Sequence, residues 1–290
     1  MYNSVARKSR IMSLAMVFKG PEGIVLAADS RVTLNATAQI NGKDYLFPST
    51  YDNATKLLTP SLQTNQTHVG AVTYGAGAIG QAAPRTAHSF MPEFDAQLIK
   101  EAVGRLSVED FSKRFSAFFM DQWNALMPAG SKPNPNENMI FLLGGFDEKS
   151  VYGRVFQVSI PSSPTPKELN AGDGNFGLVY GGQAEFSSRL LCGYDEQLVT
   201  IVKKTLSLSD DKEKELREAL KAIATAIPFQ FLPLQDCVNL SIFLIRTTIT
   251  LQTWQVGIRG VGGYIDVATV TQTKGYLPVQ QKKIKGEFID

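Results

Sequence analysis

The fold is decided by the stretch Ser13-Leu-Ala-Met-Val-Phe-Lys-Gly-Pro-Glu-Gly-Ile-Val-Leu-Ala-Ala-Asp-Ser-Arg31. It contains two short apolar runs, at 13–18 and 23–28, with turn-forming Gly and Pro residues between them. Short apolar runs bounded by such residues are typical of two β-strands joined by a tight turn. We therefore predict an opening β-hairpin that is buried on at least one face.

Two charged groups stand out against this apolar background. Asp29 ends the second run, and Lys56 stands at the head of another short apolar run at 55–58. A buried charge needs a partner, because removing it from water is costly. Each group alone is consistent with an ordinary internal or surface ion pair. If they pair with each other, they form a charged couple beside the start of the first strand.

Farther along the chain, apolar spacing alternates between strand-like and helical patterns. Ser107-Val-Glu-Asp110 opens a helix, with a Ser cap and acidic residues in the first turn. The sequence predicts strands at 55–58, 69–74, 139–143, 154–159, 176–180 and 265–270, helices at 82–105, 107–127, 185–206, 212–227 and 234–251, and a loop at 162–174. Segregated helices and antiparallel hairpins favour an α+β layered sandwich over a doubly wound parallel sheet.

Composition excludes several classes of function. The 290 residues include 29 Lys and Arg against 27 Asp and Glu, a net charge of +2, which argues against a nucleic-acid or membrane-surface binder. Charged residues are only 19%, below the roughly 25% of an average soluble domain, so part of the surface is expected to be buried against other subunits. Two cysteines fit a reducing cytoplasm, and two histidines are too few for a Cys/His zinc site. The sequence has no apolar run of about 20 residues that would span a membrane.

The loop Gly75-Ala-Gly-Ala-Ile-Gly80 formally matches a dinucleotide-binding fingerprint. Its surroundings are not a strand–helix–strand unit, so the match is weak. A tight turn between a strand and a helix explains the glycines better, because they let the backbone approach closely. Exposed N–H groups in such a turn would also suit an oxyanion site.

The opening hairpin resembles that of proteasome β-type subunits, which are N-terminal nucleophile hydrolases and include bacterial relatives. Further pieces follow in the family's order: Lys56-Leu-Leu58, Tyr74-Gly-Ala-Gly77, Leu106-Ser-Val-Glu109, Leu143-Gly-Gly-Phe-Asp-Glu148 and Val261-Gly-Gly-Tyr-Ile-Asp-Val-Ala-Thr269. The resemblance covers most of residues 13–275. It implies a four-layer αββα sandwich of two antiparallel sheets flanked by helices, with no metal and no cofactor.

The resemblance also implies a catalytic set. Ser13 would attack the substrate once it is the first residue of the chain, and its own α-amine, with a pKa of roughly 7.7–8, would accept the proton. Lys56 would lower the proton affinity of the nucleophile, with Asp29 orienting that lysine. The N–H of Gly75 would stabilise the oxyanion.

The substrate would bind as an added strand, and the same alignment assigns its contacts. Backbone contacts come from Thr33 and Gly77, and the walls of the primary pocket come from Val32, Ala54, Leu58 and Thr73. These walls are uncharged, so we expect cleavage after apolar residues.

Some of the family's supporting groups are not matched. Its serine in the later glycine-rich turn is replaced by Gly181 or Gly182, and its Asp and Ser before the last double glycine are not matched by Ile258 and Val261. Asp236 is a candidate substitute for the missing aspartate. These departures bear on activity more than on fold.

Domain boundaries follow from the same alignment. Residues 1–12 are expected to be a propeptide or the product of a misassigned start at Met1, since Met12 directly precedes Ser13. Residues 13–290 then form one domain, with a surface insertion at 34–52 and a C-terminal tail at 276–290.

Three functions remain open. The first is a cytoplasmic self-compartmentalising peptidase that forms homo-oligomeric rings and cleaves peptides or unfolded polypeptides. The chain has no nucleotide-binding loop, so any ATPase unfoldase that serves it would be a separate protein. The second is an inactive ring-forming subunit, and the third is an amide hydrolase or ligase for a small substrate.

Overall fold

The computed structural model describes residues 13–286 except 42, 82, 129, 133, 135 and 136. The expected propeptide or misassigned start at 1–12 lies outside the described residues. Helices and antiparallel sheets are segregated along the chain, so the α+β class expected from the sequence is confirmed.

The first large sheet carries the opening hairpin at its centre. Neighbouring strands run antiparallel throughout, in the order β10–β1–β2–β11–β12. Its strands are β1 (Leu14–Lys19), β2 (Ile24–Asp29), β10 (Gly177–Gly182), β11 (Ile265–Thr271) and β12 (Gly275–Gln280). Every residue of β1 and β2 is buried, which explains why both strands are uninterrupted apolar runs.

The second large sheet is also antiparallel, in the order β5–β6–β7–β8–β9. Its strands are β5 (Leu57–Leu58), β6 (Val69–Gly75), β7 (Met139–Gly145), β8 (Arg154–Ile160) and β9 (Ser163–Leu169). The two sheets face each other across a shared apolar core that includes Leu26 and Ala268 from the first sheet and Val72 and Leu142 from the second.

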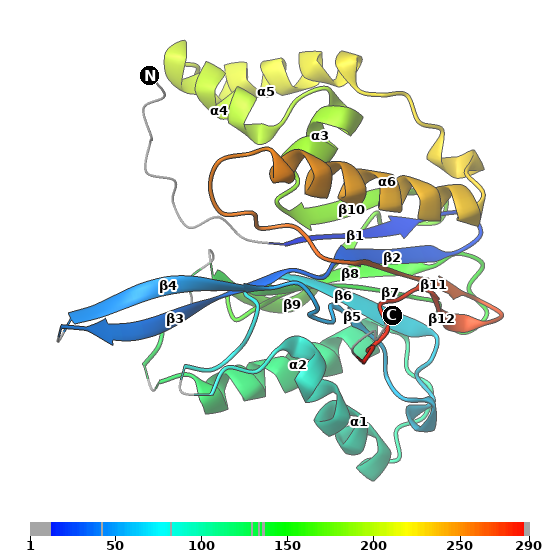
Figure 1. Ribbon diagram of the computed structural model, residues 1–290. Coiled ribbons are helices and arrows are strands. Elements are labelled where there is room, and N and C mark those ends of the chain that lie inside the picture. The colour runs from blue at the N-terminus through cyan, green and yellow to red at the C-terminus, as the bar shows by residue number, and fades with distance from the viewer. Residues whose placement is uncertain are drawn as a thin grey trace.

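Helices cover the outer face of each sheet (Figure 1). On the first sheet α6 packs on β1, β2 and β11, while α2 packs on β7, β8 and β9 of the second. The helices are α1 (Met91–Lys100), α2 (Val108–Leu126), α3 (Glu185–Cys192), α4 (Glu196–Thr205), α5 (Asp210–Leu220) and α6 (Leu234–Thr253), with short 3-10 helices at Leu62–Thr64, Ala87–Phe90, Lys221–Ile223 and Phe229–Phe231.

The helix-covered cores are of different character. Beneath the second sheet, Phe94, Phe115, Phe119 and Phe141 form edge-to-face and tilted ring pairs with centroids 4.5–5.4 Å apart. Aliphatic side chains dominate the core above the first sheet. In both cores, helices cover the outer face of a sheet. Binding or catalytic sites are therefore expected at the sheet edges and loops, which the helices leave free.

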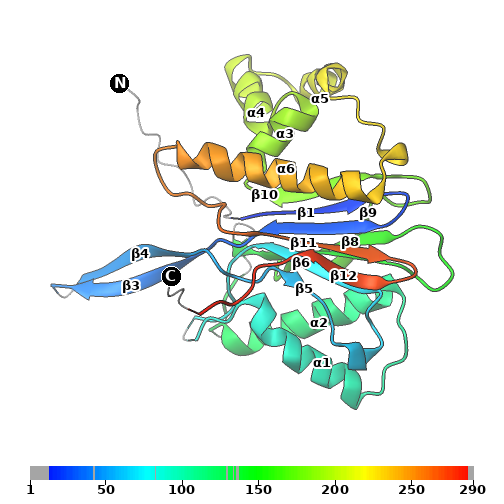
Figure 2. The same cartoon turned by 45° about the vertical axis from the view of Figure 1, so that its right-hand side comes forward.

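The segment at 34–52 forms most of a long hairpin. Strands β3 (Val32–Ile40) and β4 (Lys43–Tyr51) pair only with each other and extend away from the body of the molecule (Figure 2). On β4 the side chains of Tyr45, Phe47 and Tyr51 are 44–58% exposed. The base of this hairpin adjoins the end of β2, so it frames one side of the region around Asp29.

Two segments expected to lack regular structure are strands. β9 lies within the predicted loop at 162–174, and β12 occupies the start of the predicted tail at 276–290. Pro164 and Pro166 argued against a strand, yet β9 lies at the edge of its sheet, where a missing N–H removes no ladder bond.

Three predicted helices are shorter than expected. The helix at 212–227 ends at Leu220 as α5 and is followed by the 3-10 turn at Lys221–Ile223. The helix at 82–105 is reduced to α1 and a preceding 3-10 turn, and it ends where Ala102 adopts φ 49°. The helix at 185–206 is divided into α3 and α4 by Gly193, which caps α3 with φ 82°. A left-handed residue ends a helix because it redirects the backbone.

Among the described residues, no helix combines the length and apolarity needed to cross a bilayer.

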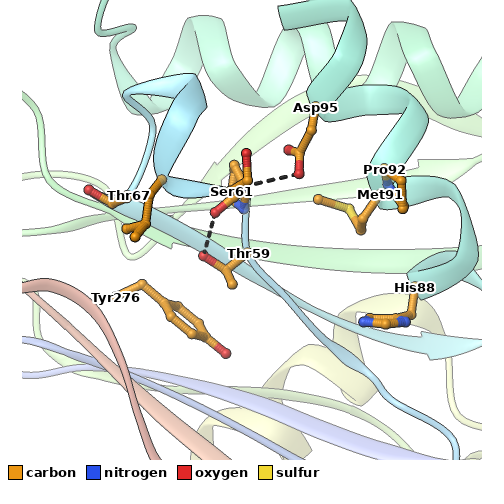
Figure 3. A pocket seen from close by; sticks show the side chains of 10 residues that line it. Thr59, Ser61, Thr67, His88, Met91, Pro92, Asp95 and Tyr276 are labelled. Atoms are coloured by element: carbon orange, nitrogen blue, oxygen red, sulfur yellow. Dashed lines mark hydrogen bonds between the residues drawn. The ribbon is translucent and has the colours of Figure 1, made fainter. Parts of the chain in front are cut away.

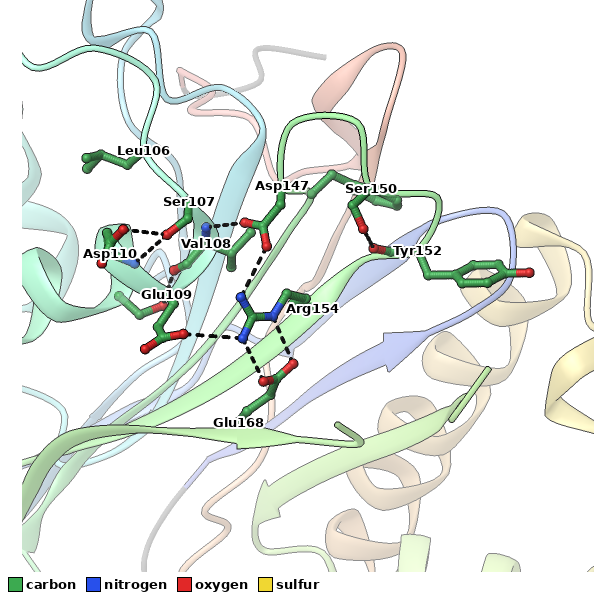
Figure 4. A network of polar contacts seen from close by, with 12 residues as sticks. Leu106, Ser107, Val108, Glu109, Asp110, Asp147, Ser150, Tyr152, Arg154 and Glu168 are labelled. Atoms are coloured by element: carbon green, nitrogen blue, oxygen red, sulfur yellow. Dashed lines mark hydrogen bonds and ion pairs between the residues drawn. The ribbon is translucent and has the colours of Figure 1, made fainter. Parts of the chain in front are cut away.

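Arg154 joins four segments around the end of the second sheet (Figure 4). Its guanidinium donates two bonds to Glu168 on β9, at 2.9 and 2.7 Å, and one to Asp147 in the β7–β8 turn at 3.1 Å. Asp147 in turn accepts from the N–H of Val108 at the start of α2. The bond from Arg154 also lowers the pKa of Glu168.

We predict that Arg154→Met destabilises the protein by roughly 1 kcal/mol at pH 7, since these contacts are partly screened by water. A carboxylate with a depressed pKa adds stability above its ordinary pKa of about 4.3, and this is lost as the pH falls through the folded-state value. The difference between wild type and variant should therefore shrink below about pH 4. Thermal unfolding at pH 7 and pH 3 measures it. Arg154→Lys should restore only part of the loss, because an ammonium lacks the paired donors; equal stability of wild type and Arg154→Met at pH 7 would contradict the prediction.

Candidate functional site

The opening hairpin brings Ser13 and Asp29 together. In the β1–β2 register Ala15 faces Ala28, so the start of β1 lies beside the end of β2. The N–H of Leu14 donates to Asp29 Oδ1 at 3.0 Å. An antiparallel pair of this length therefore places the residue before β1 next to the carboxylate that ends β2.

Asp29 is fully buried and accepts four hydrogen bonds. Besides Leu14 N–H, Oδ1 accepts from Lys56 Nζ at 2.5 Å. Oδ2 accepts from the N–H groups of Arg31 at 3.1 Å and Gly262 at 2.9 Å. Two oxygens with four acceptor positions are thereby saturated, as an ionised carboxylate requires when it is removed from water.

Lys56 lies just before β5 and is also buried, with its side chain 6% exposed. Burial lowers its pKa, and the charge of Asp29 and the hydrogen bond to it act in the opposite direction. The paired charges predicted from the sequence are thus adjacent. An ammonium held in this way is a fixed positive charge at the edge of the site.

Ser13 is 4% exposed and adopts φ 113°, a conformation that is uncommon for a residue with a side chain. Its carbonyl accepts from Gln183 N–H at 2.8 Å, and its hydroxyl lies 3.5 Å from the carbonyl oxygen of Arg31. Gly182 makes room for this contact: a Cβ there would stand 2.0 Å from Ser13 O. A side chain at position 182 would therefore collide with the Ser13 carbonyl.

Six of the ten site residues expected from the sequence line one small pocket. They are Ser13, Val32, Ala54, Lys56, Thr73 and Gly77. Thr55, Tyr74, Ala76, Thr86 and Ala87, which sequence reasoning did not select, complete the lining. The cavity measures about 20 Å³, room for about one water molecule, so a substrate side chain can enter only if the walls separate.

The other four expected residues lie outside this lining. Asp29 does not line the pocket itself but contacts Lys56, which does. Gly75 ends β6 with φ 94°, and a Cβ there would stand 2.2 Å from Asn138 O, so only glycine fits. Thr33 stands on β3 with its hydroxyl 3.4 Å from that of Thr50. Leu58 packs into the core shared with α1 and α2.

The glycine spacing at 75–80 does not belong to a strand–helix–strand unit. β6 pairs antiparallel with both β5 and β7, and α1 begins only at Met91. The dinucleotide-binding interpretation is therefore wrong, because that fingerprint requires a strand–helix–strand unit and this loop is not part of one.

A second polar layer behind the site was not predicted. Ser30 and Asp266 are buried, and Ser30 Oγ donates to Asp266 Oδ2 at 3.3 Å. Lys282 Nζ contacts both groups. Asp266 could have been found in the sequence, since a carboxylate within the apolar strand 265–270 needs a partner just as Asp29 does.

A buried amide pair supports the other side. Gln252 on α6 donates to Gln183 Oε1 at 2.6 Å and accepts from Val261 N–H at 3.0 Å. Since Gln183 N–H also donates to Ser13 O, the two glutamines connect the Ser13 carbonyl to the loop that carries Gly262. Asp236, the candidate substitute, is instead exposed in the first turn of α6, next to the β1–β2 turn and thus at the opposite end of β1.

A larger cavity of about 380 Å³ lies outside this site (Figure 3). Thr59, Met91, Asp95 and Tyr276 are among its walls, and Ser61 N–H donates to Asp95 at 3.1 Å. Burial raises the pKa of Asp95. The cavity contains none of the residues selected from the sequence. Across the described part of the chain, no group of three or more His, Cys, Asp or Glu side chains is placed to hold a metal ion.

No family model and no curated protein sequence matches this chain. What the site does must therefore be inferred from its own geometry.

We predict that Asp29→Asn costs roughly 3–5 kcal/mol in the free energy of unfolding, because it leaves the buried Lys56 ammonium without its carboxylate. The double variant Asp29→Asn/Lys56→Met should lose less than the sum of the single changes, since neither buried charge then remains unpaired. Urea unfolding followed by circular dichroism measures both. Asp121→Asn, at an exposed position on α2, is the matched control and should be nearly silent; an Asp29→Asn variant as stable as this control would contradict the prediction.

Proposed function

We propose that this chain is an N-terminal nucleophile hydrolase of the proteasome β type, which cleaves peptide bonds with Ser13. The observation that carries the proposal is the contact set of Asp29. A single buried carboxylate oxygen accepts from both Leu14 N–H, next to the nucleophile, and Lys56 Nζ. Ser13 and Lys56 then line the same pocket.

The proposed fold follows from the same resemblance. In this proposal the fold is an αββα sandwich of four layers. The layers are helices α3 and α6, the sheet that contains β1, the sheet that contains β6, and helices α1 and α2. Residues 13–290 then form one domain, and residues 1–12 must be removed before the reaction. Removal is required because the nitrogen of Ser13 is otherwise part of a peptide bond and cannot act as a base.

The first half of the reaction forms an ester. Ser13 Oγ attacks the substrate carbonyl carbon while its proton passes to the α-amine of Ser13, whose ordinary pKa of roughly 7.7–8 suits a general base. The positive charge of Lys56 lies beside the nucleophile and favours loss of the hydroxyl proton from Ser13 Oγ. The carbonyl oxygen becomes negative and is stabilised by the N–H of Gly75.

The second half restores the enzyme. The amine product leaves with the proton that the α-amine returns, and the acyl group stays on Ser13 Oγ. Water then gives a proton to the α-amine and attacks the ester carbonyl, so that the carboxylic acid leaves and Ser13 regains its hydroxyl proton. The cycle needs neither a metal nor a cofactor.

Binding of the substrate uses the pocket and its rim. Thr33 and Gly77 would pair with the substrate backbone as with an added strand. Val32, Ala54, Leu58 and Thr73 would set the preference for an apolar side chain, with Leu58 acting from the core behind the pocket. Stacked homo-oligomeric rings, a separate ATPase unfoldase and a cytoplasmic location complete the proposal; the two free cysteines, Cys192 and Cys237, agree with a reducing compartment.

We predict that Ser13→Ala lowers hydrolysis of fluorogenic peptides at least about a thousandfold, as loss of a catalytic nucleophile does in other enzymes. Ser13→Thr should retain activity because it keeps the hydroxyl. Intact mass spectrometry must show a chain that begins at Ser13 in the active preparation. Ser163→Ala, on the exposed side of β9, is the matched control. Activity in Ser13→Ala, or in a chain that still carries residues 1–12, would exclude the mechanism; an unprocessed and inactive chain would favour the inactive ring-forming subunit.

We predict that Ala54→Asp shifts the preference from apolar towards basic side chains before the scissile bond. The ratio of kcat/KM for lysine- and leucine-containing peptides should rise by roughly tenfold, as one charge-assisted contact provides. Parallel assays of the two peptides on wild type and variant measure the ratio. An unchanged ratio would remove Ala54 from the specificity pocket.

A further inference from the structure

The segment after β12 reaches the site because of sheet topology. Ile265 faces Asp29 in the β2–β11 register, so β11 begins where β2 ends. β12 runs antiparallel to β11, and therefore its last residues return to the same place. Gln280 donates to Ile265 O at 2.6 Å, and Lys282 follows two residues later.

Lys282 is held at this place by both its backbone and its side chain. Its N–H donates to Asp266 Oδ1 at 2.9 Å, and its ammonium contacts Asp266 Oδ2. The same ammonium lies 3.2 Å from Ser30 Oγ. The side chain is only 11% exposed, whereas the adjacent Lys283 is exposed. An ammonium that is largely removed from water needs such contacts to compensate for its lost hydration.

Ser30 connects these contacts to the site. Its N–H donates to Gly262 O at 3.0 Å, and its carbonyl accepts from Ala54 N–H at 2.9 Å. Gly262 N–H in turn donates to Asp29, and Ala54 lines the pocket. Lys282 thus contacts Ser30, the central residue of the turn between Asp29 and Arg31.

The charges also balance as a group. Asp29 and Asp266 are two buried carboxylates in adjacent strands, and Lys56 and Lys282 are their partners. Without Lys282, Asp266 would be an uncompensated negative charge near the Asp29–Lys56 pair. The field at Lys56 depends on both members of the second pair, since Asp266 raises and Lys282 lowers its pKa.

We propose that Lys282 is a positioning residue for the hydrolytic site: it neutralises Asp266 and holds Ser30, and thereby fixes the turn that aims Asp29 at Lys56. This inference rests on the proposed function for its catalytic consequence, but not for the structural one. Lys282 contacts no substrate, so its effect should fall on the rate of the bound complex and not on substrate affinity.

The kinetic test compares Lys282→Met, Lys282→Arg and the matched control Lys283→Met in the full chain. We expect Lys282→Met to lower kcat roughly ten- to hundredfold with little change in KM, because small displacements of catalytic groups have effects of this size. Lys282→Arg should recover most of the rate, and Lys283→Met should equal wild type. A wild-type kcat in Lys282→Met would overturn the proposal, as would an equal loss in Lys283→Met.

The double variant Asp266→Asn/Lys282→Met covers the case in which Lys282→Met does not fold. It leaves no unpaired buried charge, so it should fold, yet it should still react slowly because Ser30 has lost the ammonium. A wild-type kcat in this variant would overturn the proposal.

Amide hydrogen exchange separates this inference from the proposed function. The N–H groups of Leu14, Arg31 and Gly262 all donate to Asp29 and should exchange faster in the double variant, while that of Leu142 in β7 should be unchanged. Unaltered exchange at all three would overturn the role of Lys282. Faster exchange in a protein whose wild type shows no Ser13-dependent hydrolysis would support Lys282 as the anchor of this turn and refute the peptidase.

Discussion

The burial of the Asp29 carboxylate determines how the surrounding chain is arranged. Its two oxygens need four donors, and these come from four segments: Leu14 in β1, Arg31 after β2, Lys56 before β5, and Gly262 before β11. Losing any one of them would leave part of a charge unsatisfied in a dry interior. The Asp29 carboxylate therefore fixes these four segments relative to one another, because its burial requires a donor from each of them.

Two glycines near Ser13 and the pocket allow close contacts that a side chain would block. Gly182 lets the backbone approach Ser13 O, and Gly77 leaves space occupied by Val32, where a Cβ would lie 2.1 Å from Cγ2. The strained φ of Ser13 persists because the Leu14 N–H and the Ser13 carbonyl are both fixed by hydrogen bonds. Backbone strain of this kind is retained where surrounding contacts over-determine the conformation.

Most of the fold could be predicted from local patterns, whereas the second layer of the site could not. The apolar runs of β1 and β2 and the Ser107 cap are visible within a few residues, and the paired charges of Asp29 and Lys56 follow from the cost of isolating either one. β9 was missed because its prolines are compatible only with an edge position. β12 contains Pro278 and four exposed residues, so it lacks the buried apolar run that marks β1 and β2, and its sequence indicates a surface tail. Lys282 and the Gln183–Gln252 pair depend on contacts between residues far apart in sequence, which no local pattern encodes.

The two lysine–carboxylate pairs suggest how a site can be both rigid and reactive. Asp29 saturates its oxygens with donors from fixed backbone, so it cannot rotate away from Lys56 without leaving several N–H groups unpaired. The second pair lies behind it and restrains the same turn from the opposite side through Ser30. Because three of the four charges are buried and the Lys282 side chain is only 11% exposed, water screens them little, and a displacement of one changes the field at the others. The position of the Lys56 charge is thus set by the packing of β11 and β12 as well as by Asp29, so the C-terminal strands support the proposed site.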